Sequence, residues 1–215
     1  MSLWRQAIRH LGGQASRTAT RWAVVDVEAS GLDARRDRLL AIAAIAIDAE
    51  AAAPRIVLGD SFEVVLRQDE VVADKPNILL HGIGVGAQRG GVPAAQALQD
   101  FERWRAGAPL LAFHAAFDQT LIARAFASRL RRRLDAEWVD LEHVAEVVQP
   151  AVAARTLDEW MAHFGIRCAQ RHQAAADALA TAELLLKLWP AIRRQAPRPD
   201  FGALQQMAGQ RRWLP

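Results

Sequence analysis

Apolar residues in the first half of the chain are grouped in short runs that have the length of β-strands. The run at residues 22–27 stays apolar until its last third, which is typical of a buried strand. The longer run at 39–47 fits a second buried strand or a buried helix, because periodicity alone does not separate the two. Residues 61–66 alternate apolar and polar positions and predict a third strand. The first half therefore predicts two or three consecutive strands.

The second half of the chain alternates strand-like runs with helical patterns. Pro93 is a favourable first residue for a helix, and Gly107 a favourable stop. The expected elements are helices at residues 93–107, 121–130, 156–164 and 174–189, with short strands at 110–113 and 138–141. Consecutive strands followed by strands that alternate with helices predict an α/β fold with a mixed sheet flanked by helices.

The two ends of the chain differ from the part between them. Residues 3–11 place apolar side chains on one helical face and predict a short amphipathic helix. Residues 197–215 show little periodicity and are expected to form a tail. The expected organisation is an N-terminal helical extension at 1–20, a main domain at 21–190 and a C-terminal tail at 191–215.

Composition limits the class of protein. The chain has 215 residues, of which 52% are hydrophobic and 24% charged, so it is expected to fold around a proper core. Cys168 is the single cysteine, which excludes an internal disulfide and a thiolate zinc site. Segments with the apolar character of a membrane span or a signal peptide are not found in the sequence. A cytoplasmic protein without a membrane partner is the expectation.

The charge balance is a weak guide to partners. The net charge is only +3, although the sequence pI is about 9.9. Tyrosine is absent and Lys75 and Lys187 are the only lysines, so arginine, which stays charged, sets the pI. The basic residues Arg124, Arg129 and 131–133 form a cluster that fits a phosphate-binding track or a solvated helix face equally well.

Two acidic residues stand at the end of the first predicted strand. Asp26 and Glu28 are two positions apart, so their side chains leave the strand on the same face. Like charges held close together are unfavourable unless a cation lies between them. The adjoining residues 29–31 are turn-like, and their backbone N–H groups can approach a ligand closely. Taken alone, the pair is better explained by exposed carboxylates at a fraying strand end.

Further polar residues stand near the starts of two helices. Asp118 follows the strand at 110–113, and His172 and Asp177 open the helix at 174–189. Each is explained singly by the helix dipole or by surface exposure. Together with Asp26 and Glu28 they make four carboxylates beside core segments, which is the ligand set that two hard divalent cations need. A histidine at the rim supplies a base for the attacking water.

Three motifs in the same order resemble those of the DEDDh (DnaQ-like) 3′→5′ exonucleases, a family that includes the proofreading epsilon subunit of bacterial DNA polymerase III. The first is VDVEASGL with Asp26 and Glu28, the second HAAFDQTLI with Asp118, and the third HQAAADALATAELL with His172 and Asp177. The resemblance extends from about residue 22 to residue 189, which is most of the chain.

The resemblance implies a ribonuclease H-like fold with about five strands and an exonuclease domain at 21–190. It implies hydrolysis of terminal phosphodiesters of DNA or RNA from the 3′ end, with release of nucleoside 5′-monophosphates. His172 would be the general base, and the four carboxylates would be catalytic ligands of two Mg²⁺ or Mn²⁺ ions. The residues implied for substrate binding are Ala29, Ser30, Gly31, His81 and His114.

The chain departs from the family pattern at positions that hold substrate. Ala29 stands where many members have threonine. Phe113 and His114 stand where the second motif often has His and Asn. The segment ILLHGIG keeps His81 but has Gly84 where threonine is usual. These departures affect the grip on substrate and leave the expected metal ligands intact.

Several alternatives remain open at the level of sequence. Whether the substrate is single-stranded DNA or RNA cannot be read, because a two-metal site ignores the 2′ position. A second class of function is a non-catalytic nucleic-acid-binding module that kept the fold. A third is an accessory subunit that docks a polymerase, another partner or a second copy through residues 1–20 or 197–215.

Overall fold

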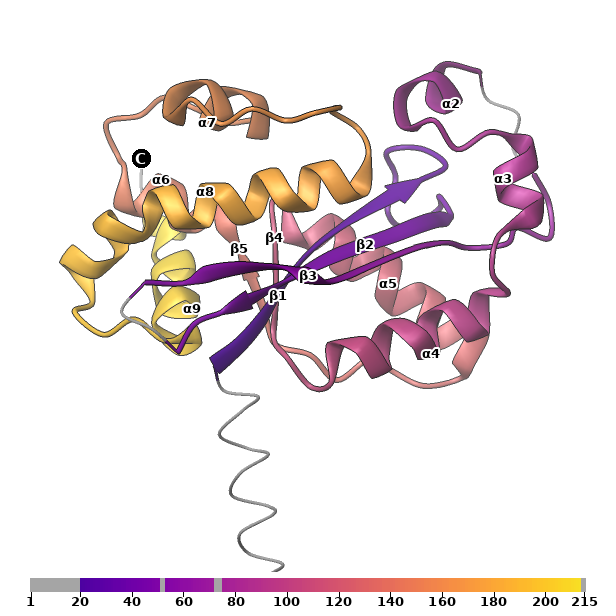
Figure 1. The fold of residues 1–215 in the computed structure, drawn as a ribbon, viewed down its shortest axis with the longest axis horizontal. Coiled ribbons are helices and arrows are strands. Elements are labelled where there is room, and N and C mark those ends of the chain that lie inside the picture. The colour runs from indigo at the N-terminus through magenta and orange to yellow at the C-terminus, as the bar shows by residue number, and fades with distance from the viewer. Residues whose placement is uncertain (1–19, 51–52, 72–74, 214–215) are drawn as a thin grey trace, which may run out of the picture.

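The computed structural model describes residues 20–50, 53–71 and 75–213, so the helix expected at 3–11 lies outside the described residues. A five-stranded sheet with the order β3-β2-β1-β4-β5 forms the centre of the fold (Figure 1). Its strands are β1 (Arg21–Ala29), β2 (Leu39–Asp48), β3 (Arg55–Val65), β4 (Leu110–Ala112) and β5 (Trp138–Asp140). β1 is antiparallel to β2 and parallel to β4. The predicted mixed sheet is confirmed, and the run at 39–47 is a strand.

Helices cover both faces of this sheet (Figure 1). The helices are α2 (Lys75–His81), α3 (Val85–Gly90), α4 (Ala94–Arg105), α5 (Ala115–Leu130), α6 (Leu141–Val148), α7 (Leu157–Phe164), α8 (Ala174–Gln195) and α9 (Phe201–Gln210), followed by the 3₁₀ helix η1 (Arg211–Trp213). No helix among the described residues is both long enough and apolar enough to cross a membrane.

The side chains of β1 divide between two hydrophobic cores. Trp22 and Val24 belong to the core shared with α6, α7, α8 and α9. Ala23, Val25 and Val27 belong to the core shared with α4 and α5. This division follows from the alternation of side chains along a strand. Because helices cover both faces of β1, the polar groups of this strand lie at its two ends, with Arg21 at one end and Asp26 and Glu28 toward the other.

The C-terminal residues do not form the tail expected at 191–215. α8 continues to Gln195, and the separate helix α9 places Phe201, Leu204 and Met207 in the core. The Phe201 ring packs edge-on against Trp22 with 5.7 Å between ring centroids. Only three large apolar residues of α9 face the core, and they are separated by Gly, Ala and Gln, so its amphipathic pattern is weak in the sequence. The prediction of a tail is therefore wrong for the residues up to 213.

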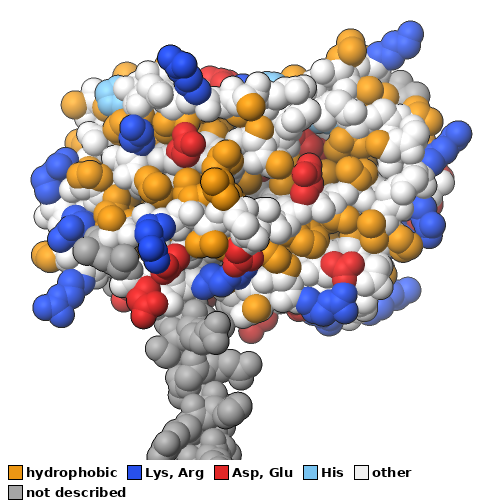
Figure 2. Space-filling model, in the orientation of Figure 1, with side chains coloured by type: hydrophobic (Ala, Val, Ile, Leu, Met, Phe, Trp, Pro, Cys, Tyr) orange, Lys and Arg blue, Asp and Glu red, His pale blue; other side chains and the backbone are white. Residues whose placement is uncertain are grey.

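Charged side chains on the face crossed by α8 are dispersed (Figure 2). Lys and Arg side chains lie around the edge of this face, several of them close to Asp or Glu, and apolar side chains occupy much of its middle. A broad basic patch is therefore not present on this face, and any concentration of arginines has to be sought elsewhere on the molecule.

Candidate active site

The end of β1 brings the first motif to the edge of the sheet. Asp26 and Glu28 alternate with buried Val25 and Val27, so their side chains leave β1 on the face covered by α8. The pairing of β1 with β2 becomes irregular between Glu28 and Ala29. Such an irregularity ends regular pairing and changes the direction of the chain beside the two carboxylates.

Two helix N-termini supply the remaining carboxylates. Asp118 and Asp177 lie in the first turns of α5 and α8, and both are buried, with exposed fractions of 4% and 6%. α5 follows β4, and β4 is parallel to β1, so the carboxyl ends of these two strands lie at the same edge of the sheet. Ligand sites of α/β sheets form at this edge. The positive ends of the helix dipoles also favour a carboxylate in each position.

The Asp26 carboxyl lies in the electric field of the other three carboxylates. Burial raises the pKa of Asp26 well above its usual value, and Asp118, Asp177 and Glu28 raise it further. Burial and the charge of Asp177 raise the pKa of Glu28 to about 8. Burial likewise raises the pKa of Asp118. The structure thus brings together the four carboxylates on which the sequence analysis was based.

His172 lies beside this cluster, in the loop before α8. Its backbone has a positive φ of 61°, and its backbone N–H donates to Oδ2 of Asp177 at 3.0 Å. The imidazole itself is exposed. Histidine tolerates this left-handed conformation better than most residues do. The backbone of His172 therefore positions Asp177 and leaves the side chain free at the rim.

Arg171 is a member of the cluster that the sequence analysis missed. Its guanidinium forms ion pairs with Asp177 and with Asp158, the latter at 2.6 Å between Nε and Oδ1. Asp177 is therefore partly neutralised by a cation of the chain itself. The residue precedes the third motif directly, but nothing in the sequence pattern indicates that its side chain turns toward Asp177.

The turn at Ala29, Ser30 and Gly31 is fixed by hydrogen bonds. The Ser30 hydroxyl donates to Oδ1 of Asp37 at 3.0 Å and accepts from the Arg38 backbone N–H at 2.9 Å. A Cβ atom at Gly31 would lie 2.6 Å from an Asp37 carboxylate oxygen, so a larger residue there would have to displace the Asp37 side chain. The Ser30 hydroxyl is thus used to hold the loop, and what the turn can offer a ligand at its surface is mainly backbone.

His81 is buried at the end of α2. Its Nδ1 accepts from the Ile83 backbone N–H at 2.9 Å, and its Nε2 has no hydrogen-bond partner among the described residues. Burial lowers the pKa of His81, so the neutral imidazole is favoured. α2 itself is attached to the first motif, because Asn77 Nδ2 donates to the Ala29 carbonyl at 3.0 Å.

His114 precedes α5 and belongs to a second polar group next to Asp118. Its backbone N–H donates to Oδ1 of Asp140 at 3.2 Å, and its Nε2 lies 3.0 Å from Oε2 of Glu142, which raises the pKa of His114. Among the described residues, Asp140, Glu142 and His143 have ligand atoms within 4.8 Å of one another. The charge of Asp140 also raises the pKa of Asp118. This group is not evident from the sequence, because Asp140 ends a three-residue strand that carries no motif.

The donor types of the main cluster suit divalent cations, although no three of its carboxylates have ligand atoms within 4.8 Å of one another in the described part of the chain. Asp26, Glu28, Asp118 and Asp177 offer oxygen ligands, which Mg²⁺ and Mn²⁺ prefer. Burial and, after it, repulsion between these groups raise the pKa values of Asp26 and Glu28, and a bound cation would offset both effects. The second group, at Asp140, adds two carboxylates and an imidazole near the same sheet edge.

Comparisons with known proteins identify the family of the chain. The family model described as exonuclease matches residues 23–185. Curated relatives include a PolC-type DNA polymerase III of Oceanobacillus iheyensis, 29% identical over 167 residues that are 78% of this chain and 11% of that protein. A DNA polymerase III subunit epsilon-like protein of Rhodobacter capsulatus is 27% identical over 186 residues, or 85% of this chain and 25% of that protein. The chain thus spans only a small part of these relatives.

Solved structures show the same fold. Escherichia coli exonuclease I in complex with a dT13 oligonucleotide superposes with a TM-score of 0.68 at 18% identity, over 82% of this chain and 42% of that one. Cell-death related nuclease 4 superposes with a TM-score of 0.66 at 12% identity, over 80% of this chain and 64% of that one. Because the family model spans most of the chain and the predicted motifs lie within it, the chain belongs to the exonuclease family, the DnaQ-like type that its motifs resemble.

Proposed function

We propose that the protein is a metal-dependent 3′→5′ exonuclease that removes nucleoside 5′-monophosphates from the end of a nucleic-acid strand. The observation that carries this proposal is the placement of Asp26, whose carboxyl lies in the field of three other carboxylates. Holding four carboxylates together lowers stability unless cations bind between them. The exonuclease family assignment supports the same reaction class.

In the proposed reaction, the four carboxylates of the main cluster hold two divalent cations. When bound, such a pair stabilises the attacking and leaving oxygens of a phosphoryl displacement. His172 accepts the proton of the attacking water at an imidazole nitrogen, which is possible because its ring is exposed at the rim of the cluster. The Ala29–Gly31 turn, His81 and His114 are the proposed contacts for the terminal nucleotide.

The substrate and the partner are proposed from the relatives. Single-stranded DNA or RNA is the proposed substrate, because exonuclease I with the same fold was solved with a dT13 oligonucleotide. A DNA polymerase is the proposed protein partner, because the curated relatives include DNA polymerase III proteins. The proposal covers substrates with either hydrogen or hydroxyl at the 2′ position, that is, both DNA and RNA.

Digestion of end-labelled strands tests the proposed function. With Mg²⁺ or Mn²⁺, a linear strand labelled at the 5′ end should shorten stepwise, and one labelled at the 3′ end should release labelled mononucleotide at once. EDTA should abolish both reactions. Single-stranded circles of the same sequence should survive, because they present no 3′ end. Circles cut as fast as linear strands would identify an endonuclease and contradict the proposal.

Arg171 allows a second test of the cation site that does not depend on activity. Its guanidinium is paired with Asp177 and would compete with a cation for that carboxylate. Replacing Arg171 with Gln should tighten Mn²⁺ binding roughly fivefold, which corresponds to ~1 kcal/mol. It should also lower the melting temperature of the metal-free protein. Calorimetric titration with Mn²⁺ measures the first effect, and Arg167→Gln, an exposed arginine of the same loop, is the control. Equal Mn²⁺ affinities for all three proteins would show that Arg171 does not compete for the site.

A further inference from the structure

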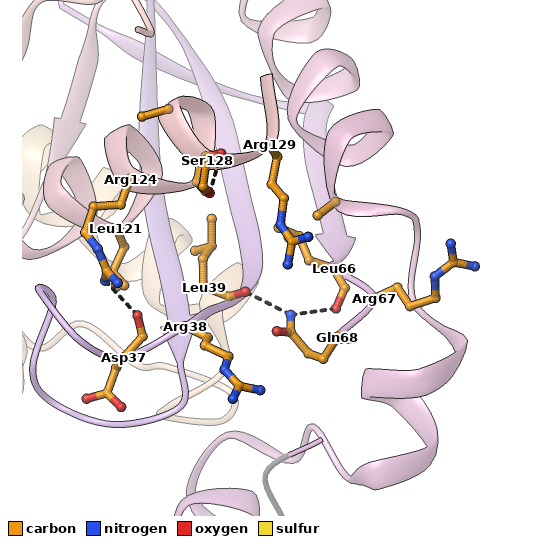
Figure 3. A pocket seen from close by; sticks show the side chains of 13 residues that line it. Asp37, Arg38, Leu39, Leu66, Arg67, Gln68, Leu121, Arg124, Ser128 and Arg129 are labelled. Atoms are coloured by element: carbon orange, nitrogen blue, oxygen red, sulfur yellow. Dashed lines mark hydrogen bonds between the residues drawn. The ribbon is translucent and has the colours of Figure 1, made fainter. Parts of the chain in front are cut away.

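A cavity of about 470 Å³ lies between α5, the end of β3 and the loop that joins β1 to β2 (Figure 3). Apolar residues of its lining include Leu39, Leu66 and Leu121. Arg38, Arg124 and Arg129 lie around it from two sides, with Arg38 on the loop side and the other two on α5 (Figure 3). A cavity with apolar lining and convergent polar groups has the usual character of a ligand site.

Arg124 keeps its positive charge uncompensated. Its Nη1 donates to the backbone carbonyls of Ala34 at 2.6 Å and Asp37 at 2.8 Å, which are neutral acceptors. The Asp37 carboxylate is engaged elsewhere, because its oxygens accept from the Ser30 hydroxyl and from the Asp33 backbone N–H. The guanidinium is therefore held in a fixed position by the loop without being neutralised by it.

Two further arginines of the cavity, Arg38 and Arg129, have partners that an anion can replace. Arg38 pairs with Glu70 at 3.0 Å and Arg129 with Asp69 at 2.8 Å. The side chains of Glu70 and Asp69 are 83% and 72% exposed. Ion pairs this exposed contribute little free energy and are weakened by salt. A phosphate group that offers two oxygens to a guanidinium forms a stronger, bidentate contact.

The cavity begins close to the candidate active site. Asp118, Ala125 and Arg129 occupy positions i, i+7 and i+11 of α5, so they lie along one stripe of the helix. Arg124 and Arg129 are about 9 and 17 Å along the helix axis from Asp118 at 1.5 Å per residue. On the other side, the Arg38 backbone N–H is bonded to Ser30, two residues after Glu28.

We infer that this arginine cavity binds the phosphodiester backbone of the substrate strand upstream of the 3′ end. The inference rests on the proposed function, since it takes the strand end to lie at Asp118. A stacked strand advances about 3.4 Å per nucleotide, so the two α5 arginines stand roughly three and five nucleotides from the site of cleavage. Guanidinium groups bind the phosphates, and the leucine lining accepts sugars and bases.

Arg124 and Arg129 belong to the basic cluster noted in the sequence, and the structure separates them from its other members at 131–133. Arg132 pairs with Glu102, with 2.7 Å between Nη1 and Oε1, and its guanidinium lies over the Phe126 ring. Arg131 and Arg133 are exposed beyond the end of α5 and do not line the cavity. The sequence left phosphate binding and a solvated helix face equally open, and the cavity assigns the first role to Arg124 and Arg129.

Strand-length dependence of binding tests the inference. The variant Arg38→Gln/Arg129→Gln leaves Arg124 in place, so the loop that Arg124 holds stays intact. Arg131→Gln/Arg133→Gln removes the same net charge outside the cavity and is the matched control. Fluorescence anisotropy with labelled single-stranded oligonucleotides of 2 and 12 nucleotides gives the dissociation constants, and melting temperatures report folding.

The cavity variant should bind the 12-mer roughly tenfold more weakly, while its affinity for the dinucleotide changes less than twofold. Loss of two phosphate contacts should reduce the salt slope of 12-mer binding by about 1.4. The control variant should bind both strands like the unmodified protein, and Arg38→Lys/Arg129→Lys should keep most of the salt slope because it keeps the charge. Equal losses for the cavity and control variants would overturn the inference.

The two proposals fail in different ways. If the unmodified protein binds the 12-mer, the cavity variant does not, and neither hydrolyses it, the role of the cavity in strand binding is supported and the exonuclease function is rejected. If the protein hydrolyses strands and the cavity variant binds the 12-mer as well as the unmodified protein does, the exonuclease function is supported and the role of the cavity in strand binding is rejected. Binding of an acidic peptide but of no oligonucleotide would assign the arginines to a protein partner and also overturn the inference.

Discussion

The metal-free protein is expected to lose stability between pH 5 and pH 8.5, and Mn²⁺ is expected to restore it. The pKa of Glu28 is raised to about 8 in the folded chain, against an ordinary value of 4.5. Between these two values the folded state binds more protons than the unfolded state, so raising the pH favours unfolding. The stabilisation is complete below about pH 4.5 and is lost as the pH rises through about 8.

The size of this effect is on the order of a few kcal/mol, since each pKa unit corresponds to about 1.4 kcal/mol and Glu28 is partly exposed to solvent. Asp26 and Asp118, whose pKa values are also raised, add to it in the same direction. A cation bound among the carboxylates removes the repulsion and stabilises only the folded state. Mn²⁺ should therefore increase the free energy of unfolding much more at pH 8.5 than at pH 5.

Urea unfolding at the two pH values, in EDTA and in Mn²⁺, measures the prediction. Glu28→Gln removes the titrating group, so this variant should show a smaller loss of stability with pH and a weaker response to Mn²⁺. Glu63→Gln, an exposed residue of β3, is the matched control and should behave like the unmodified chain. A metal-free protein that is more stable at pH 8.5 than at pH 5 would show that the carboxylates do not form the repulsive cluster described above.

Some helices and strands could be predicted from the sequence and others could not, depending on their length and on how their side chains are buried. β1 was predicted because its apolar run has strand length and ends in polar residues, whereas the continuous apolar run of β2 fitted a buried strand or a buried helix equally well. α6 was not predicted: it has only eight residues and follows the strand β5 without a separating turn, so its short apolar pattern does not stand apart from that of the strand. α9 was missed for the opposite reason, because only a few apolar residues in it pack on the core.

The candidate site shows a similar division. The carboxylates were found because their motifs place them at the ends of predicted strands and the starts of predicted helices. Arg171 and Asp140 were missed because their roles depend on neighbours brought together by folding. Asp140 binds the backbone of His114, which is 26 residues away, and Arg171 spans from Asp158 to Asp177. Contacts of this kind leave no periodic signal in a single sequence.

Substitution of His172 should reduce turnover strongly while leaving cation binding intact. As the general base, its imidazole takes the proton of the attacking water, and loss of such a group costs roughly 10²–10⁴ in rate. His172→Ala keeps the backbone N–H that donates to Asp177, so the carboxylate remains positioned. Asp177→Asn should differ, because it weakens Mn²⁺ binding as well as turnover.

The left-handed backbone at His172 requires a second variant. A φ of 61° costs an alanine roughly 1 kcal/mol, so His172→Ala can disturb the loop as well as remove the base. Asparagine adopts this conformation readily but does not accept a proton at neutral pH. If His172 is the base, His172→Asn is as slow as His172→Ala, with a melting temperature close to that of the unmodified chain. If the ring only stabilises the loop, His172→Asn recovers most of the turnover. Rates at saturating Mn²⁺, measured beside melting temperatures, decide between the two, and a folded His172→Asn protein with unreduced turnover would exclude His172 as the general base.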